Sequence, residues 1–271
     1  MPYKISLLAA LLCGHAAAQS EPPLAPSDLA TDRPGFTEPT NIIDPGALQL
    51  ENGFSIEWGR DASRQFTGGS PLIRVGISRR FELRLASDGF LSTAERGEQG
   101  TVRRRGIADA GIGAKVGILQ EARFLPALSI LPSLSLPSGD SAFSGRGYDP
   151  QVNLSWSKNL PGGFNVGGNA IVAAITEGGK RGLQRAFSVS AAHNLPRGFG
   201  AYAEVFNIRP AGAADRPVSV VNGGLTYLLS PNAQVDVEAG WAVAGPGPRL
   251  FLAGGLVIRL PRAFTRFLGV R

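Results

Sequence analysis

A single histidine follows the N-terminal twenty residues, and we first ask whether it could serve a catalytic serine. His193 lies close in the sequence to Ser188 and Ser190. Nucleophilic catalysis requires a serine within hydrogen-bonding reach of the histidine. In a β-strand the side chains alternate between two faces, so both serines would point away from His193. The stretch GDSAF at 139–143 lacks the strand–turn–helix context of a nucleophile motif. The sequence therefore predicts that the protein is not an enzyme.

The sequence also predicts neither a cofactor nor a metal site. The acidic residues do not follow the spacing of a calcium-binding loop, and GGKRG at 178–182 lacks the glycine spacing of a phosphate-binding loop. Cys13 is the one cysteine, so a cluster of thiolate ligands is excluded.

Charged side chains recur at alternate positions in segments whose other positions are apolar. In AQVDVEAGWAV, Asp236 and Glu238 share one parity, and Val235 and Val237 share the other. A period of two is typical of a β-strand with one polar and one apolar face. The same alternation places ten charged residues on the polar faces of their strands, and in a barrel these would line the lumen: Glu51, Glu57, Arg74, Glu82, Arg84, Asp109, Lys115, Asp236, Glu238 and Arg259.

Twelve segments have the alternation or length of a strand. They run over residues 47–58, 71–79, 81–88, 108–119, 124–137, 150–158, 163–175, 185–195, 199–209, 217–229, 233–243 and 249–260. Many are close to the length of a tilted strand that crosses a bilayer. The connections alternate between long and short, with long ones at 59–70, 89–107 and 138–149. This rhythm is typical of outer-membrane barrels and has no reason to arise in a soluble sandwich.

The stretch PALSILPSLSLPSGD has one apolar and one polar face, and by itself it fits both a soluble sandwich and a membrane barrel. Leu128 and Ile130 fall on one parity, and Ser129 and Ser133 fall on the other. Aromatic residues near strand ends suit the interfacial girdles of a membrane barrel. We therefore predict an all-β, antiparallel, up-and-down transmembrane barrel of about 12 strands, with the leucines facing lipid and the serines facing the lumen.

The N-terminus has the pattern of an export signal. Lys4 precedes an apolar run, and Ala16-Ala17-Ala18 provides small residues for signal-peptidase cleavage after Ala18. We predict four parts: a signal peptide at 1–18, an extended leader at 19–46, the barrel at 47–260 and a tail at 261–271. The expected location is the outer membrane, with the lipid bilayer and the outer-membrane assembly machinery as partners.

The positive net charge of the chain does not indicate nucleic-acid binding. The net charge is +6, but only 18% of the residues are charged and the arginines are scattered. The one cluster is Arg103, Arg104 and Arg105, and no helix-turn-helix or zinc spacing accompanies it. We therefore expect no nucleic-acid partner.

Several stretches resemble a known family. TDRPGFTEPTNIIDPGALQLENGF, GIADAGIGAKVGIL, LPSLSLPSGD and NGGLTYLLSPNAQVDVEAGW are similar to the "transporter" family, also described as a MetA pathway of phenol degradation. The resemblance covers nearly the whole chain after residue 18. It implies a proteobacterial outer-membrane barrel with a porin-like or uptake role, and no catalytic motif. The segment PRAFTRFLGVR departs from the pattern, because such barrels usually end on the last strand.

Two functions stay open on the sequence. The first is a channel, transporter or binding protein for small solutes, aromatic or hydrophobic ones among them. The alternative is a structural or adhesive barrel that presents the loops at 59–70, 89–107 and 138–149; a membrane hydrolase ranks below both. The lumen charges would form a polar path in the first case and a salt-bridged plug in the second.

Overall fold

The computed structural model describes residues 28–97, 100–212 and 216–265. The signal peptide predicted for 1–18, the first part of the leader and the last part of the tail lie outside the described residues. No helix in these ranges has the length and apolar character needed to cross a membrane.

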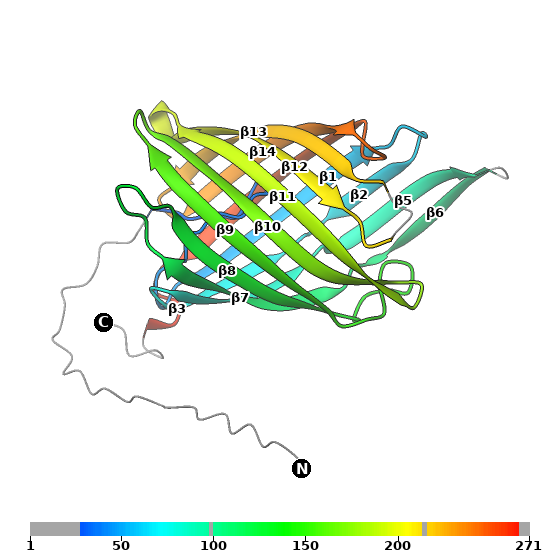
Figure 1. The fold of residues 1–271 in the computed structure, drawn as a ribbon, viewed down its shortest axis with the longest axis horizontal. Coiled ribbons are helices and arrows are strands. Elements are labelled where there is room, and N and C mark those ends of the chain that lie inside the picture. Colours follow the sequence, from blue (N-terminus) through cyan, green and yellow to red (C-terminus); the bar gives the residue numbers. More distant parts are fainter. Residues whose placement is uncertain (1–27, 98–99, 213–215, 266–271) are drawn as a thin grey trace, which may run out of the picture.

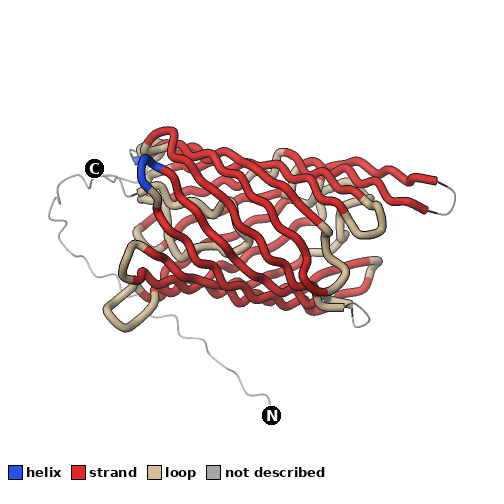
Figure 2. The backbone as a smooth tube through the Cα atoms, turned by 90° about the horizontal axis from the view of Figure 1, so that it is seen from above, coloured by secondary structure: helices blue, strands red, loops and turns tan. Residues whose placement is uncertain are grey.

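Within the described residues, fifteen strands form one antiparallel sheet that closes on itself (Figures 1 and 2). They are β1 (Leu48–Trp58), β2 (Arg64–Gly68), β3 (Leu72–Ser78), β4 (Phe81–Ser87), β5 (Phe90–Gly97), β6 (Gly100–Ile107), β7 (Ala110–Leu119), β8 (Ala127–Leu136), β9 (Asp149–Leu160), β10 (Phe164–Glu177), β11 (Lys180–Asn194), β12 (Phe199–Arg209), β13 (Val218–Ser230), β14 (Ala233–Ala244) and β15 (Leu250–Leu260). A short 3-10 turn at Pro196–Gly198 joins β11 to β12.

The barrel closes where β1 meets β15. These two strands pair along their whole length, from Leu48 opposite Leu260 to Trp58 opposite Leu250. The closed wall consists of twelve strands, namely β1, β3, β4 and β7 to β15. This confirms the predicted fold class. Closure leaves no unpaired strand edge in the hydrocarbon region of a bilayer.

The remaining three strands extend the wall at one end, where two long connections were expected to be loops. The predicted loop 59–70 contains β2, and the predicted loop 89–107 contains β5 and β6. Both assignments are wrong. The alternation in these segments is weak, because both parities carry polar residues in runs such as Arg103-Arg104-Arg105. By contrast, residues 138–148 contain no strand, as expected.

A sharp bend separates the wall from this extension. Gly89, between β4 and β5, has φ of +71°, and a Cβ atom there would lie 2.0 Å from the carbonyl oxygen of Gly69. Only glycine allows both the left-handed backbone and this close approach. In Figure 1 the β5–β6 hairpin projects beyond the rest of the barrel.

The two faces of the wall follow the predicted parity. In β1 the side chains of Gln49 and Glu51 are buried, whereas Leu50 and Phe54 are 41% and 53% exposed. In β8 Ser129 is fully buried. The apolar side chains therefore cover the outside of the barrel, and the polar side chains face its interior.

Candidate functional site

The described part of the leader, residues 28–46, lies inside the barrel and forms the centre of the site. It starts beside β1 and β3, where the carbonyl oxygen of Ala30 accepts hydrogen bonds from Gln49 and Arg74. It then crosses to the opposite wall and returns, so that the amide of Gly46 donates to Gly76 in β3. A lumen of twelve strands is wider than side chains alone readily fill. The leader fills part of this space.

Asp32 of the leader is the centre of a buried ion cluster. Its carboxylate lies 2.8 Å from Lys115 Nζ and 3.4 Å from Arg74 Nη1, and it also forms an ion pair with Arg84. The amide of Asp32 donates to Glu51 at 3.1 Å and 3.2 Å. Charges removed from water must be paired in this way, because an isolated buried ion is strongly unfavourable.

The wall strands place the partners of Asp32 next to one another. Arg74 of β3 lies opposite Arg84 of β4, and Glu82 of β4 lies opposite Lys115 of β7. Residues opposite each other in an antiparallel pair share a face, so all four side chains point into the lumen. Arg74 donates to both carboxylate oxygens of Glu82 at 2.9 Å, a paired geometry typical of arginine and carboxylate. The negative charge of Glu82 therefore offsets the repulsion between the two neighbouring arginines.

On the opposite wall the leader is held by acidic side chains. Arg33 forms an ion pair with Asp236 of β14, at 3.0 Å. Glu204 of β12 accepts hydrogen bonds from the backbone amides of Phe36 and Thr37. The same carboxylate accepts a hydrogen bond of 2.8 Å from Asn222 of β13.

Between these two walls, hydroxyl and amide side chains of β9, β10 and β11 complete the contact. The amide of Glu38 donates to Asn169 of β10 at 2.8 Å. The hydroxyls of Thr37 and Ser188 lie 2.8 Å apart, and those of Thr40 and Ser157 lie 2.6 Å apart. The leader therefore contacts strands on every side of the barrel.

The structure brings most of the ten candidate charges together around the leader. Glu51, Arg74, Glu82, Arg84, Lys115 and Asp236 bond to the leader. Glu238 accepts a hydrogen bond from Asn222 and lies on the same inner wall.

The other three candidates lie at the two ends. Arg259 donates to Asn232 and lies 3.8 Å from Asp44 of the leader. Asp109 holds a connection rather than the lumen, because it accepts the backbone amides of Gly139 and Gly145. Glu57 is partly buried at the end of β1 and lines a cavity there.

Sequence patterns missed the leader side of the site. Asp32, Arg33 and Glu38 lie in an irregular segment, where no period predicts what they face. Glu204 does lie on the polar parity of its strand, and Tyr202, two residues earlier, has the same parity. The alternation of this strand could therefore have indicated that Glu204 faces the lumen.

The His193 side chain forms no catalytic arrangement. Its ring stacks on Phe164 with centroids 4.5 Å apart, and its Nδ1 lies 3.0 Å from the carbonyl oxygen of Gly163. Ser188 instead bonds to Thr37 and Asn169. In the part of the chain that the structure describes, His, Cys, Asp and Glu side chains form no group of three suited to a metal ion.

One protein family matches most of the chain. A family model described as "Putative MetA-pathway of phenol degradation" matches residues 31–260. The chain belongs to this family. A search of curated proteins found no match.

Solved structures similar to this family member are outer-membrane barrels. An outer membrane channel from Pseudomonas putida F1 has a TM-score of 0.62 at 13% identity, covering 84% of this chain and 99% of that one. The β domain of the Bordetella autotransporter BrkA has a TM-score of 0.52 at 12% identity, covering 80% and 100%. The KdgM porin has a TM-score of 0.48 at 13% identity, covering 78% and 98%. The first two likenesses show the fold and support an outer-membrane location.

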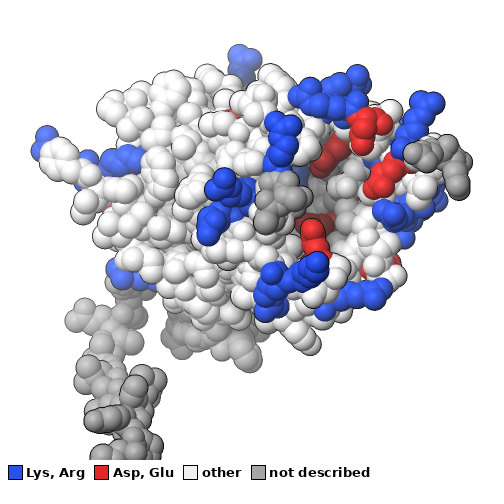
Figure 3. Space-filling view, turned by 45° about the vertical axis from the view of Figure 1, so that its right-hand side comes forward, with Lys and Arg blue, Asp and Glu red and all other residues white. Residues whose placement is uncertain are grey.

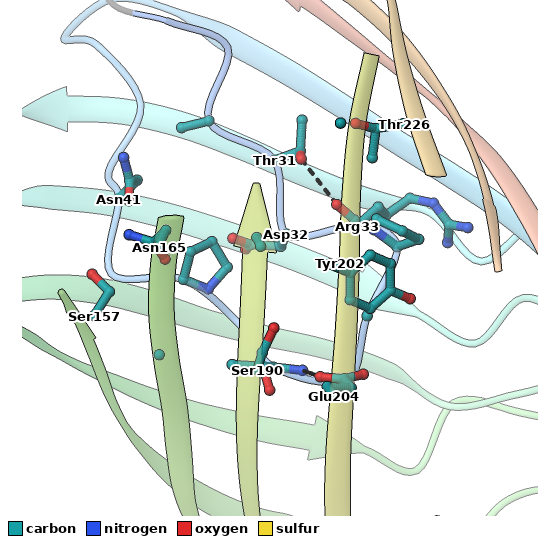
Figure 4. A pocket seen from close by; sticks show the side chains of 18 of the residues that line it. Thr31, Asp32, Arg33, Asn41, Ser157, Asn165, Ser190, Tyr202, Glu204 and Thr226 are labelled. Atoms are coloured by element: carbon teal, nitrogen blue, oxygen red, sulfur yellow. Dashed lines mark hydrogen bonds between the residues drawn. The ribbon is translucent and has the colours of Figure 1, made fainter. Parts of the chain in front are cut away.

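Cavities lie at both ends of the barrel in this member of the family. One of about 290 Å³ lies between Thr31–Arg33 and the wall residues Ser190, Tyr202 and Glu204 (Figure 4). A second, of about 480 Å³, lies at the other end of the barrel and is lined by Glu57, Arg60 and Glu95 among others. The leader and the side chains around it lie between these spaces.

The wall beyond the leader is apolar on one side. Ala173 of β10, Ala186 of β11, Val220 of β13 and Ala242 of β14 are each at most 3% exposed. Phe206 of β12 lies on the same inner face and stacks on Phe36 of the leader, with ring centroids 4.2 Å apart. The inner faces of β10 to β14 are therefore apolar only in this part, because nearer the leader the same strands carry polar side chains such as Glu204 and Asp236.

Proposed function

We propose that the protein is an outer-membrane channel for small solutes, in which the leader limits passage through the lumen. The observation that carries this proposal is the position of residues 28–46 inside the closed wall, bonded to both sides of it. In this arrangement the ionic side chains are paired with one another and do not line an open path. Passage of a solute therefore requires the leader to move.

The comparisons support the same role. The P. putida protein with this fold is named an outer membrane channel. The likeness is structural, at 13% identity, so it supports a channel but says nothing about the solute.

The solutes we propose are aromatic or otherwise hydrophobic. In the part of the lumen beyond the leader, the inner side chains from Ala173 to Ala242 are methyl and isopropyl groups, with Phe206 of β12 among them, and movement of the leader would bring a solute to them. An uncharged apolar solute gains from contact with such a wall, whereas an ion would lose hydration there.

A reversible lock on the leader tests the proposed function. The hydroxyls of Thr37 and Ser188 are 2.8 Å apart, so the double variant T37C/S188C can form a disulfide between the leader and β11. We expect oxidised protein in proteoliposomes to pass a small aromatic solute more slowly than unmodified protein, and a reductant to restore the rate.

Matched controls separate the lock from other effects. The single variants T37C and S188C carry the same substitutions but cannot form the link, so their rates should not respond to the reductant. If the oxidised double variant passes solute at the unmodified rate, movement of the leader does not control passage. If no variant passes any solute, the structural or adhesive alternative gains support.

We further propose that the protein is exported and cleaved after Ala18. The signal pattern at residues 1–18 supports this, together with a barrel fold that belongs in the outer membrane. N-terminal sequencing of protein extracted from membranes should begin at Gln19. A sequence that begins at Met1 would contradict the proposal.

A further inference from the structure

The outward face of β2, β5 and β6 differs from the rest of the outer wall. Cross-strand register shows which side chains share this face. Phe54, Gly68, Phe90 and Ile107 form the first row, because β1 pairs with β2, β2 with β5 and β5 with β6 at these positions. Phe54, Phe90 and Ile107 are 53%, 41% and 59% exposed. This row continues the apolar surface of the barrel.

The next rows along the same face change from apolar to basic. Two residues further along lie Ile56, Phe66, Ser92 and Arg105, followed by Trp58, Arg64, Ala94 and Arg103. Successive rows are about 7 Å apart, since each strand residue rises about 3.4 Å. Arg64 lies over the Trp58 ring at 5.7 Å, so these two side chains share one face, and the register from Phe54 places them on the outward parity. A basic band thus follows directly after an aromatic and apolar band.

The arginines of this band are available to a ligand. Arg64, Arg103 and Arg105 are exposed, and no ion pair joins any of them to a described residue. Arg104 is different, because it lies on the opposite face of β6 and lies 3.6 Å from Glu95. Figure 3 shows Lys and Arg side chains gathered at this end of the molecule.

The band lies at the outer end of the barrel. The other end has the short turns, such as Arg79-Arg80 and Pro231-Asn232, and the leader joins β1 there. Short turns face the periplasm in outer-membrane barrels, and long connections face the cell exterior. The basic band therefore stands where the acyl chains of the outer leaflet give way to its headgroups.

We propose that the outward face of β2, β5 and β6 binds the phosphate groups of lipopolysaccharide in the outer leaflet. Guanidinium groups match phosphate oxygens through paired hydrogen bonds. The apolar row beside them contacts the acyl chains of the same molecule. Neither a soluble polyanion nor an inorganic ion would use both rows. This inference depends on the outer-membrane location and is independent of any transport through the lumen.

Binding of lipid A to the purified full-length protein in detergent tests the proposal. Arg103→Ser together with Arg105→Ser removes two charges from the outward face, and we expect the affinity for diphosphorylated lipid A to fall about tenfold or more. The matched control is Arg104→Ser, which removes one charge from the other face of the same strand and should change the affinity by less than about twofold.

Two further probes identify the ligand chemistry. Dephosphorylated lipid A should bind the unmodified protein far more weakly than the diphosphorylated form, and inorganic phosphate should not compete at equal concentration. The proposal is overturned if the double variant binds like the unmodified protein, if R104S weakens binding as much, or if dephosphorylated lipid A binds equally well. Added salt should also weaken binding to the unmodified protein, a measurement that needs no variant.

Discussion

Asp32 shows how single residues determine the state of the lumen. One carboxylate forms ion pairs with Lys115 and with two arginines, and the backbone amide of the same residue donates to Glu51. The wall side of this cluster lies on the polar parity of its strands. Parity could not indicate Asp32, because the leader has no regular period and its contacts depend on a chain reversal that brings residues 28–46 inside.

We predict that Asp32→Asn destabilises the folded barrel by about 3–5 kcal/mol, the range for removing one partner of a buried ion pair. The cause is Lys115, which would keep only carbonyl partners, at 3.0 Å and 3.4 Å. Thermal unfolding in detergent, followed by circular dichroism, measures the effect.

The control for this variant is Glu95→Gln, which also removes a carboxylate from an ion pair. The pair between Glu95 and Arg104 is exposed, and such pairs contribute about 0–1 kcal/mol. Equal unfolding temperatures for the two variants would show that the Asp32 cluster does not stabilise the barrel.

At the scale of elements, alternation within strands predicted the wall well and its extension poorly. In β8 the leucines alternate with serines, and the structure buries Ser129 completely. Such segments separate lipid from lumen, so the period is strong. In the part of β5 and β6 that projects beyond the barrel no such separation exists, and a run such as Arg103-Arg104-Arg105 shows no alternation of polarity. These segments are strands because β5 pairs with β2, which in turn pairs with β1.

We predict that the two parities of β8 differ in their tolerance of charge. Ile130→Arg places a cation against lipid and should destabilise the barrel by about 2–4 kcal/mol if the residue lies near the midplane. Ser133→Arg introduces the same side chain three residues away on the lumen parity, and should have the smaller effect. Urea unfolding in lipid vesicles compares the two. A greater loss of stability in S133R would reverse the assignment of the faces.

At the scale of the whole molecule, the leader is joined to the closed barrel wall by ion pairs. The sequence predicted the wall, its closure between the first and last strands and the family. Whether the lumen charges form a path or a plug stayed open, because alternation shows the face of a residue but not what lies opposite. The structure pairs Asp236 with Arg33 and Asp32 with Lys115 across the lumen. These contacts join the leader to opposite walls.

The central claim is that the leader limits passage through the lumen, and single-channel conductance in planar bilayers tests it most directly. The full-length protein is compared with a variant that lacks residues 28–46 and that runs as a folded barrel on an unheated gel. We predict a larger and more continuous conductance for the variant, because it lacks the segment that joins Asp236 to Lys115 across the lumen. Equal conductance of the two proteins would contradict the claim.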